Sequence, residues 1–161
     1  MKPLYLFLVS PLLILFLSSC GQDATSGLEE TDLMRHGLPL KILAPPDLEV
    51  ESASIGSQQE FKLNGGDDFT MEVHVSEGLS GNMSELVSDL KKSIESHRFF
   101  NGYFLDEPDG FIYEFKMSET ISNFGFRRVR IQGDKEFVFR NGPGKIFTEE
   151  QATRMFKAVG G

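Results

Sequence analysis

Few side chains in this sequence are of the types that commonly carry out chemistry. There is a single cysteine, Cys20, and the three histidines are His36, His74 and His97. A zinc pair on a helix needs two histidines three or four residues apart, and these three are much too scattered for that spacing. No serine lies in a G-x-S-x-G pattern, the turn that presents the nucleophile in many hydrolases. The sequence therefore predicts no catalytic residue and no zinc site.

Two acidic groups contain the oxygen ligands that calcium prefers, Asp67-Asp68 and Asp106-Glu107-Asp109. A calcium loop needs several such ligands at a set spacing, with a distal glutamate, and neither group has that pattern. Both groups lie between expected strands, where solvated acids are common in turns. The stretches Gly65-Gly66 and Gly142-Pro143-Gly144 lack the Lys-Ser/Thr ending of a phosphate loop and are read as turns. We therefore expect no metal and no cofactor.

One group of basic residues stands out in a chain whose net charge is −8. An acidic protein is repelled by phosphate backbones, so nucleic acid is not expected as a partner. Strand alternation places Arg128 and Arg130 on one face and Arg127 on the other. The group could hold an acidic partner or lipid headgroups, or it could be a solvated sheet face with cross-strand pairs to Glu114 or Glu136. This candidate binding patch consists of Arg127, Arg128, Arg130, Lys135 and Arg140.

The sole cysteine ends a short apolar run that begins at Leu4 and follows the charged Lys2. The run is shorter than the about 20 residues that span a bilayer and has the proportions of the core of a signal peptide. The stretch Leu17-Ser18-Ser19-Cys20 resembles the lipobox of bacterial lipoproteins, which is Leu, two small residues, then Cys. The resemblance implies that a diacylglyceryl group alkylates Cys20, that the chain is cut between Ser19 and Cys20, and that the new amine is acylated.

An ordinary secretory signal, or an uncleaved anchor with a fortuitous cysteine, are the alternatives to a lipobox. In Gram-negative lipoproteins an aspartate just after the cysteine favours retention in the inner membrane, and this chain has Gly21 there. The resemblance thus implies the outer membrane, facing the periplasm, if the organism has one. We expect a signal peptide over 1–19, a lipidated cysteine and flexible tether over 20–37, and a single domain over 38–161.

Within this domain, strict alternation of apolar and polar residues predicts two strands, 59–63 and 69–75, joined by a glycine-rich hairpin loop. Weaker alternation indicates short strands within 38–43 and 48–50. Further along the chain, four strands separated by short turns predict an antiparallel meander. These strands are expected over 102–105, 111–117, 124–131 and 137–140.

Two amphipathic helices are expected, one before the meander and one after it. Asn82 with Glu85, and Thr148 with Gln151, have the spacing of a capping box, and the first helix should end near His97. Each helix has one apolar stripe at helical spacing. The stripes consist of Met83, Leu86, Val87, Leu90 and Ile94, and of Ala152, Met155, Phe156 and Val159.

The order of strands, helix, meander and helix predicts an α+β fold, with an antiparallel sheet of about six or seven strands and two helices packed on one face. The order resembles that of PsbP-like domains, in which helices lie against an antiparallel sheet. The resemblance concerns the fold alone and implies no function.

We therefore expect a membrane-anchored, non-enzymatic lipoprotein whose domain binds or positions another envelope component. One alternative is an envelope enzyme, such as a hydrolase, with a site not legible in the sequence. Another is a carrier of a lipophilic ligand, because the 15 phenylalanines could line a cavity instead of filling a core. A histidine and an acid clustered in a deep pocket would favour the enzyme, and a shallow surface would favour the binding module. The sequence indicates no oligomeric state.

Overall fold

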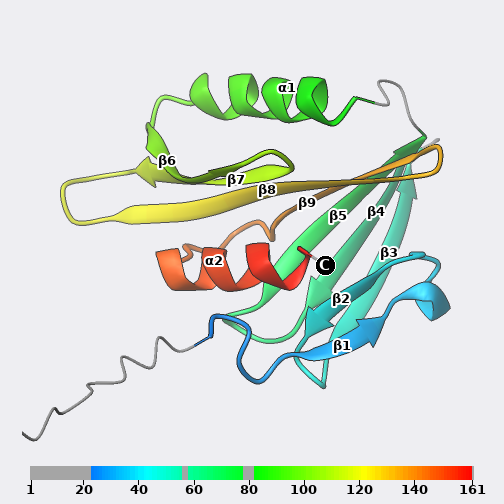
Figure 1. The fold of residues 1–161 in the computed structure, drawn as a ribbon. Coiled ribbons are helices and arrows are strands. Elements are labelled where there is room, and N and C mark those ends of the chain that lie inside the picture. The colour runs from blue at the N-terminus through cyan, green and yellow to red at the C-terminus, as the bar shows by residue number, and fades with distance from the viewer. Residues whose placement is uncertain (1–22, 56–57, 78–81, 161) are drawn as a thin grey trace, which may run out of the picture.

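A computed structural model of this chain describes residues 23–55, 58–77 and 82–160. Its described part contains a seven-stranded antiparallel sheet, a two-stranded sheet and two α-helices (Figure 1). The predicted α+β class and the predicted size of the main sheet are confirmed. The elements are β1 (Glu29–Asp32), the 3-10 helix η1 (Met34–His36), β2 (Lys41–Ala44), β3 (Glu49–Ile55), β4 (Gln58–Asn64), β5 (Thr70–Glu77), α1 (Met83–Glu95), β6 (Phe100–Glu107), β7 (Gly110–Lys116), β8 (Ser122–Gln132), β9 (Lys135–Asn141) and α2 (Glu149–Ala158).

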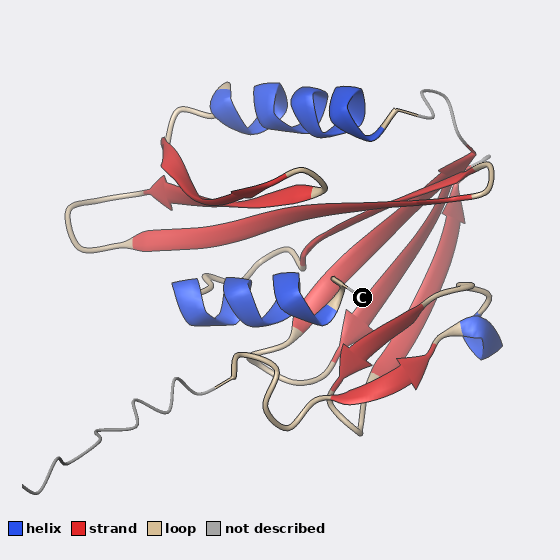
Figure 2. Ribbon diagram, in the orientation of Figure 1, coloured by secondary structure: helices blue, strands red, loops and turns tan. Residues whose placement is uncertain are grey.

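The main sheet has the strand order β3-β4-β5-β9-β8-β7-β6, and every neighbouring pair is antiparallel (Figure 2). Strands β6 to β9 form the predicted meander. The last strand of the meander, β9, pairs with β5, so the meander and the N-terminal strands form one continuous sheet. This pairing places residues far apart in the sequence, such as Glu72 and Arg140, directly opposite each other.

The caps of both helices explain where the helices begin. The Asn82 side chain accepts hydrogen bonds from the backbone N–H groups of Ser84 and Glu85, at 3.1 and 3.4 Å. At α2 the capping box is complete, because Thr148 Oγ1 accepts from Gln151 N and the Gln151 side chain accepts from Thr148 N. The predicted starts of both helices are confirmed. The first helix ends at Glu95, slightly before the predicted end.

The two helices cover opposite faces of the sheet, whereas the sequence predicts both on one face (Figure 1). On β7, Phe111 packs in the cluster beneath α1, while its neighbour Ile112 belongs to the main core with α2. On β8, Val129 packs in the cluster beneath α1, and Phe126 belongs to the main core with α2. Because both faces of these strands are apolar, each face needs a cover, and one helix supplies each.

The tether predicted over 20–37 does not extend as far as residue 37. Strand β1 pairs with β2 from Glu29↔Ala44 to Asp32↔Lys41, and Leu33 and Leu38 are fully buried in the main core. Burying a leucine side chain contributes about 1.5–3 kcal/mol, which a solvated tether would forgo. The ordered chain therefore begins before residue 38. The predicted signal peptide and Cys20 lie outside the described residues.

Candidate functional site: a groove beside α2

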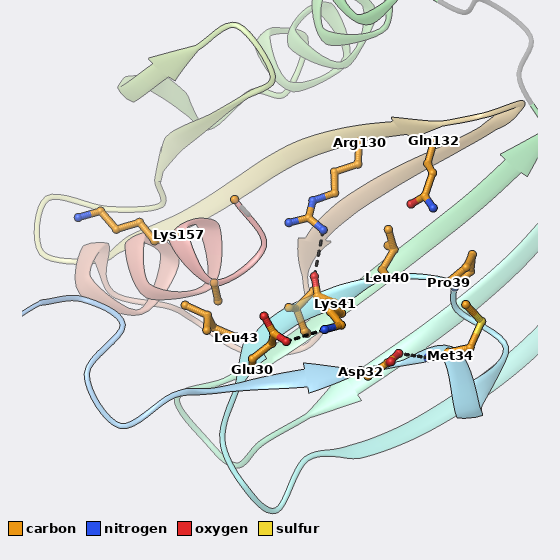
Figure 3. A pocket seen from close by; sticks show the side chains of 13 residues that line it. Glu30, Asp32, Met34, Pro39, Leu40, Lys41, Leu43, Arg130, Gln132 and Lys157 are labelled. Atoms are coloured by element: carbon orange, nitrogen blue, oxygen red, sulfur yellow. Dashed lines mark hydrogen bonds and ion pairs between the residues drawn. The ribbon is translucent and has the colours of Figure 1, made fainter.

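An open groove of about 590 Å³ lies between the β1–β2 hairpin, β8 and α2 (Figure 3). Its volume is within the range of about 300–1,000 Å³ that is usual for ligand sites. The stretch around β2 supplies much of the apolar lining, through Leu40, Ile42 and Leu43. The charged side chains that line it are Glu30, Asp32, Lys41, Arg130 and Lys157.

The charged groups of the groove are of both signs. Lys41 Nζ lies 2.7 Å from Glu30 Oε1, and this hydrogen bond raises the pKa of Lys41. Arg130 Nη1 donates to the backbone oxygen of Lys41 at 3.0 Å, which ties β8 to the hairpin (Figure 3). Burial lowers the pKa of Arg130, and the charge of Arg128 lowers it further. The groove therefore offers donors, acceptors and an apolar surface together.

Three side chains that could ligate a metal meet on the other face of the sheet. Glu60 on β4 lies opposite His74 on β5, and Glu72 shares their face because it precedes His74 by two residues. His74 Nδ1 is 3.7 Å from Glu60 Oε2, and His74 Nε2 is 3.9 Å from Glu72 Oε2. One ligand atom from each residue lies within 4.8 Å of the others. His74 Nε2 is buried and has no hydrogen-bond partner among the described residues.

The charges around this group favour an ion-pair network over a metal. Glu72 is almost fully buried and accepts from Arg140 Nε at 2.8 Å and Nη2 at 2.6 Å. Burial, and after it the charge of Arg140, lowers the pKa of His74, so the neutral imidazole is favoured. Arg127 lies opposite Arg140 on the neighbouring strand. A cation beside Glu72 would face both guanidinium groups, and Arg140 already matches the charge of Glu72.

The five basic residues of the predicted patch do not form one surface. Arg127 and Arg140 lie on the face that α1 partly covers, where Arg127 donates to the Tyr113 hydroxyl at 3.3 Å. Lys135 opens β9 at the turn after β8, opposite Gln132. The separation of Arg127 from Arg128 and Arg130 follows the predicted alternation.

Arg128 serves the packing of α2. Its Nε donates to Asp109 Oδ2 at 3.0 Å, its Nη1 donates to the backbone oxygen of Phe156 at 3.2 Å, and its guanidinium lies 4.2 Å from the centre of the Phe156 ring. Of the five predicted residues, Arg130 alone lines the groove. Acids and a backbone carbonyl from other elements engage Arg128 and Arg140, and sequence alternation cannot reveal those partners.

Most of the described phenylalanines pack in or against the two apolar clusters. Seven of them are fully buried, in line with a packing role for aromatic bulk. Phe126 and Phe156, for example, meet edge to face with ring centres 6.3 Å apart, which joins β8 to α2. The seven are Phe69, Phe111, Phe126, Phe137, Phe139, Phe147 and Phe156.

Sequence reasoning missed one wall of the groove, because Glu30 and Asp32 lie in the stretch predicted as a tether. The available signal was the alternation of apolar and polar residues in β2, which is typical of a strand. The charged and polar residues of β1 lie opposite that strand. Searches against protein-family models, curated proteins and solved structures find no match to this chain. Among the described residues, no helix has both the length and the apolar composition that a membrane span requires.

Proposed function

We propose that this chain is a lipid-anchored lipoprotein whose folded part is a binding module for another envelope component. The groove beside α2 supports the binding role, because it combines an apolar lining with charges of both signs. The lipobox Leu17-Ser18-Ser19-Cys20 supports the anchor, and Gly21 favours the outer membrane, facing the periplasm, where one exists.

The lining of the groove favours binding over catalysis. None of the residues that line it is a histidine, serine or cysteine, so it holds no hydroxyl or thiol nucleophile and no imidazole base. The histidine that does meet carboxylates, His74, lies on the far face of the sheet, where Glu72 is engaged by Arg140. A general acid–base pair needs to face a substrate. Here His74 and Glu72 lie on one face of the sheet and the groove lies on the other.

The chemistry of the groove indicates a protein segment as its partner. The exposed Met34 and the half-buried Leu43 offer contacts for apolar side chains. Lys41 and Glu30 can each exchange their exposed ion pair for one with a partner. Exposed pairs of this kind contribute only about 0–1 kcal/mol, so breaking them costs little. A segment with apolar side chains and charges of both signs would satisfy the surface.

Photocrosslinking in intact envelopes tests the binding role. A photoreactive residue at Lys41, whose side chain is 60% exposed at the groove, should give a discrete crosslinked protein. The matched control is Lys92 on α1, which is 70% exposed on the opposite face and should not give that product. Identical product patterns from the two positions would argue against the groove as the binding surface.

A further inference from the structure

We propose that the lipid anchor holds the α2 face of the domain against the bilayer surface, with α1 pointing away from it. The inference rests on the proposed lipidation of Cys20. It gives the domain an orientation and assigns a lipid surface as the partner of the exposed side of α2. Three observations carry it: the length of chain between Cys20 and the domain, the place where that chain joins the domain, and the opposite positions of the helices.

The chain between Cys20 and the ordered domain is short. The first described residue, Asp23, is three positions after the cysteine, and it already takes part in a turn in which Ser26 N donates to its backbone oxygen at 2.8 Å. Three residues span at most about 10 Å when fully extended. The polar headgroup layer alone takes roughly 5–8 Å of this reach. Asp23 must therefore lie within a few ångströms of the headgroups.

The N-terminal segment joins the domain alongside α2. Arg154 Nη1 donates to the backbone oxygen of Ala24 at 3.4 Å, and the charge of Lys157 helps to lower the pKa of Asp23, after its hydrogen bonds to Thr25. Leu28 packs against the main core, which fixes the segment to the domain. A membrane that holds Cys20 consequently lies next to the side of α2 that carries Arg154 and Lys157. Lys157 also borders the groove, so the protein segment that we propose for the groove would bind at the edge of the membrane-facing side.

The cationic groups of this side can bind lipid phosphates, and the carboxylates of Asp23 and Glu30 lie on the same side. Lys157 is exposed and Arg154 is half-buried, and the two lie one turn apart on the helix. Their cationic groups can reach lipid phosphates close to the surface. Glu149 and Glu150 are exposed in the first turn of α2 and lie at the other end of the helix. The covalent lipid supplies the affinity, so the basic pair only needs to favour one orientation.

The opposite helix provides an internal reference. Because α1 covers the other face of the sheet, its exposed side should stay in bulk solvent when α2 faces the membrane (Figure 1). Lys92 on α1 and Lys157 on α2 are both exposed lysines. They differ in the face that they occupy, so their relative reactivity reports the orientation.

The test is amine footprinting of the mature lipoprotein on preformed vesicles of phosphatidylcholine and phosphatidylglycerol, whose headgroups carry no primary amine, with a membrane-impermeant acylating reagent. Lys157 should react severalfold more slowly on vesicles than in the unlipidated Cys20→Ser protein, while Lys92 should react equally in both. Inserting about ten Gly/Ser residues between Gln22 and Asp23 should relieve most of the protection, because the coil then spans roughly 20 Å.

Equal reactivity of Lys157 in the anchored and unanchored proteins would overturn the orientation, as would protection of Lys92 instead. Protection that persists in full after the insertion would contradict the short tether as its cause. The mass of the N-terminal peptide is read from the same sample. A peptide without lipid would overturn the anchor, and the orientation with it, whereas a lipidated peptide with unprotected Lys157 would overturn the orientation alone.

Discussion

The two faces of the main sheet are built on different principles. The face toward α2 and the β1–β2 hairpin is apolar across its central strands, so burial stabilises it. The face toward α1 is apolar only beneath that helix. The residues of the first face include Phe61, Leu63, Met71, Val73, Val75, Phe137 and Phe139.

Beyond the cover of α1, the second face carries a row of charges in direct cross-strand register. The row crosses five strands, and opposite charges alternate along its first four positions, an arrangement worth roughly 0.2–1 kcal/mol for each pair. It runs Glu51, Lys62, Glu72, Arg140 and Arg127. The contrast shows that one antiparallel sheet can rest on packing at one face and on charge pairing at the other. The groove and the N-terminal segment both lie on the packed face, which is the face that we propose to lie against the membrane.

The largest expected effect on the free energy of unfolding comes from truncating a buried side chain of the packed face. Phe137→Ala removes a fully buried ring and should lower the free energy of unfolding by about 3–5 kcal/mol. Phe104→Ala removes a ring that is 51% exposed and should cost about 1 kcal/mol or less. Urea unfolding followed by circular dichroism measures both. Similar losses for the two variants would contradict the assignment of Phe137 to the buried core.

A smaller loss is expected at the charged face. Glu72→Gln leaves Arg140 and Arg127 together without their buried carboxylate and should cost about 2 kcal/mol. Glu60→Gln changes a neighbouring acid that is 30% exposed and should shift stability by about 0.5 kcal/mol or less. The same unfolding assay compares them. If Glu60 proved the costlier position, the charge row would not be centred on Glu72.

The two helix caps allow the faces to be compared directly, because Asn82 caps the helix on one face and Thr148 caps the helix on the other. Thr148→Ala and Asn82→Ala each remove a side-chain cap and should each cost about 1 kcal/mol. Only the Thr148 variant, which loosens α2, should also reduce crosslinking from Lys41 in the groove. A reduction by the Asn82 variant as well would show that the two faces are not independent.

The smallest effect is a pH dependence from His74. Burial and the charges of Arg140 and Arg127 lower its pKa below the usual 6.5, against the opposing pull of Glu60 and Glu72. The unfolded chain therefore binds more protons than the folded chain just below pH 6.5, so stability falls as the pH drops through that region and is full above about pH 7.5. His74→Gln should flatten this slope in unfolding measured between about pH 7.5 and 5.5. An unchanged slope of stability against pH would show that a group other than His74 causes the pH dependence.

Much of the fold could be predicted from local patterns. Alternation located β4, β5 and the meander, and capping residues located the starts of both helices, because these signals act within a few residues. The face that each helix covers depends on both sides of β7 being apolar, as Phe111 and Ile112 show, and periodicity within a helix contains no such information.

The groove and the charge row were beyond sequence reasoning because they depend on long-range pairing. Arg130 reaches the backbone of Lys41, and Glu72 meets Arg140 only because β5 pairs with β9. The five basic residues predicted as one patch do not form one surface, for the same reason. Its members alternate between faces, and carboxylates distant in the sequence bind Arg128 and Arg140.

The proposed anchor at Cys20 underlies the membrane orientation of the two faces, and the intact mass of the mature protein from membranes tests it most directly. We expect a chain that lacks residues 1–19 and carries a diacylglyceryl group on Cys20, and a Cys20→Ala protein that leaves the membrane fraction. A chain with an unmodified Cys20, or unchanged fractionation of Cys20→Ala, would contradict the anchor.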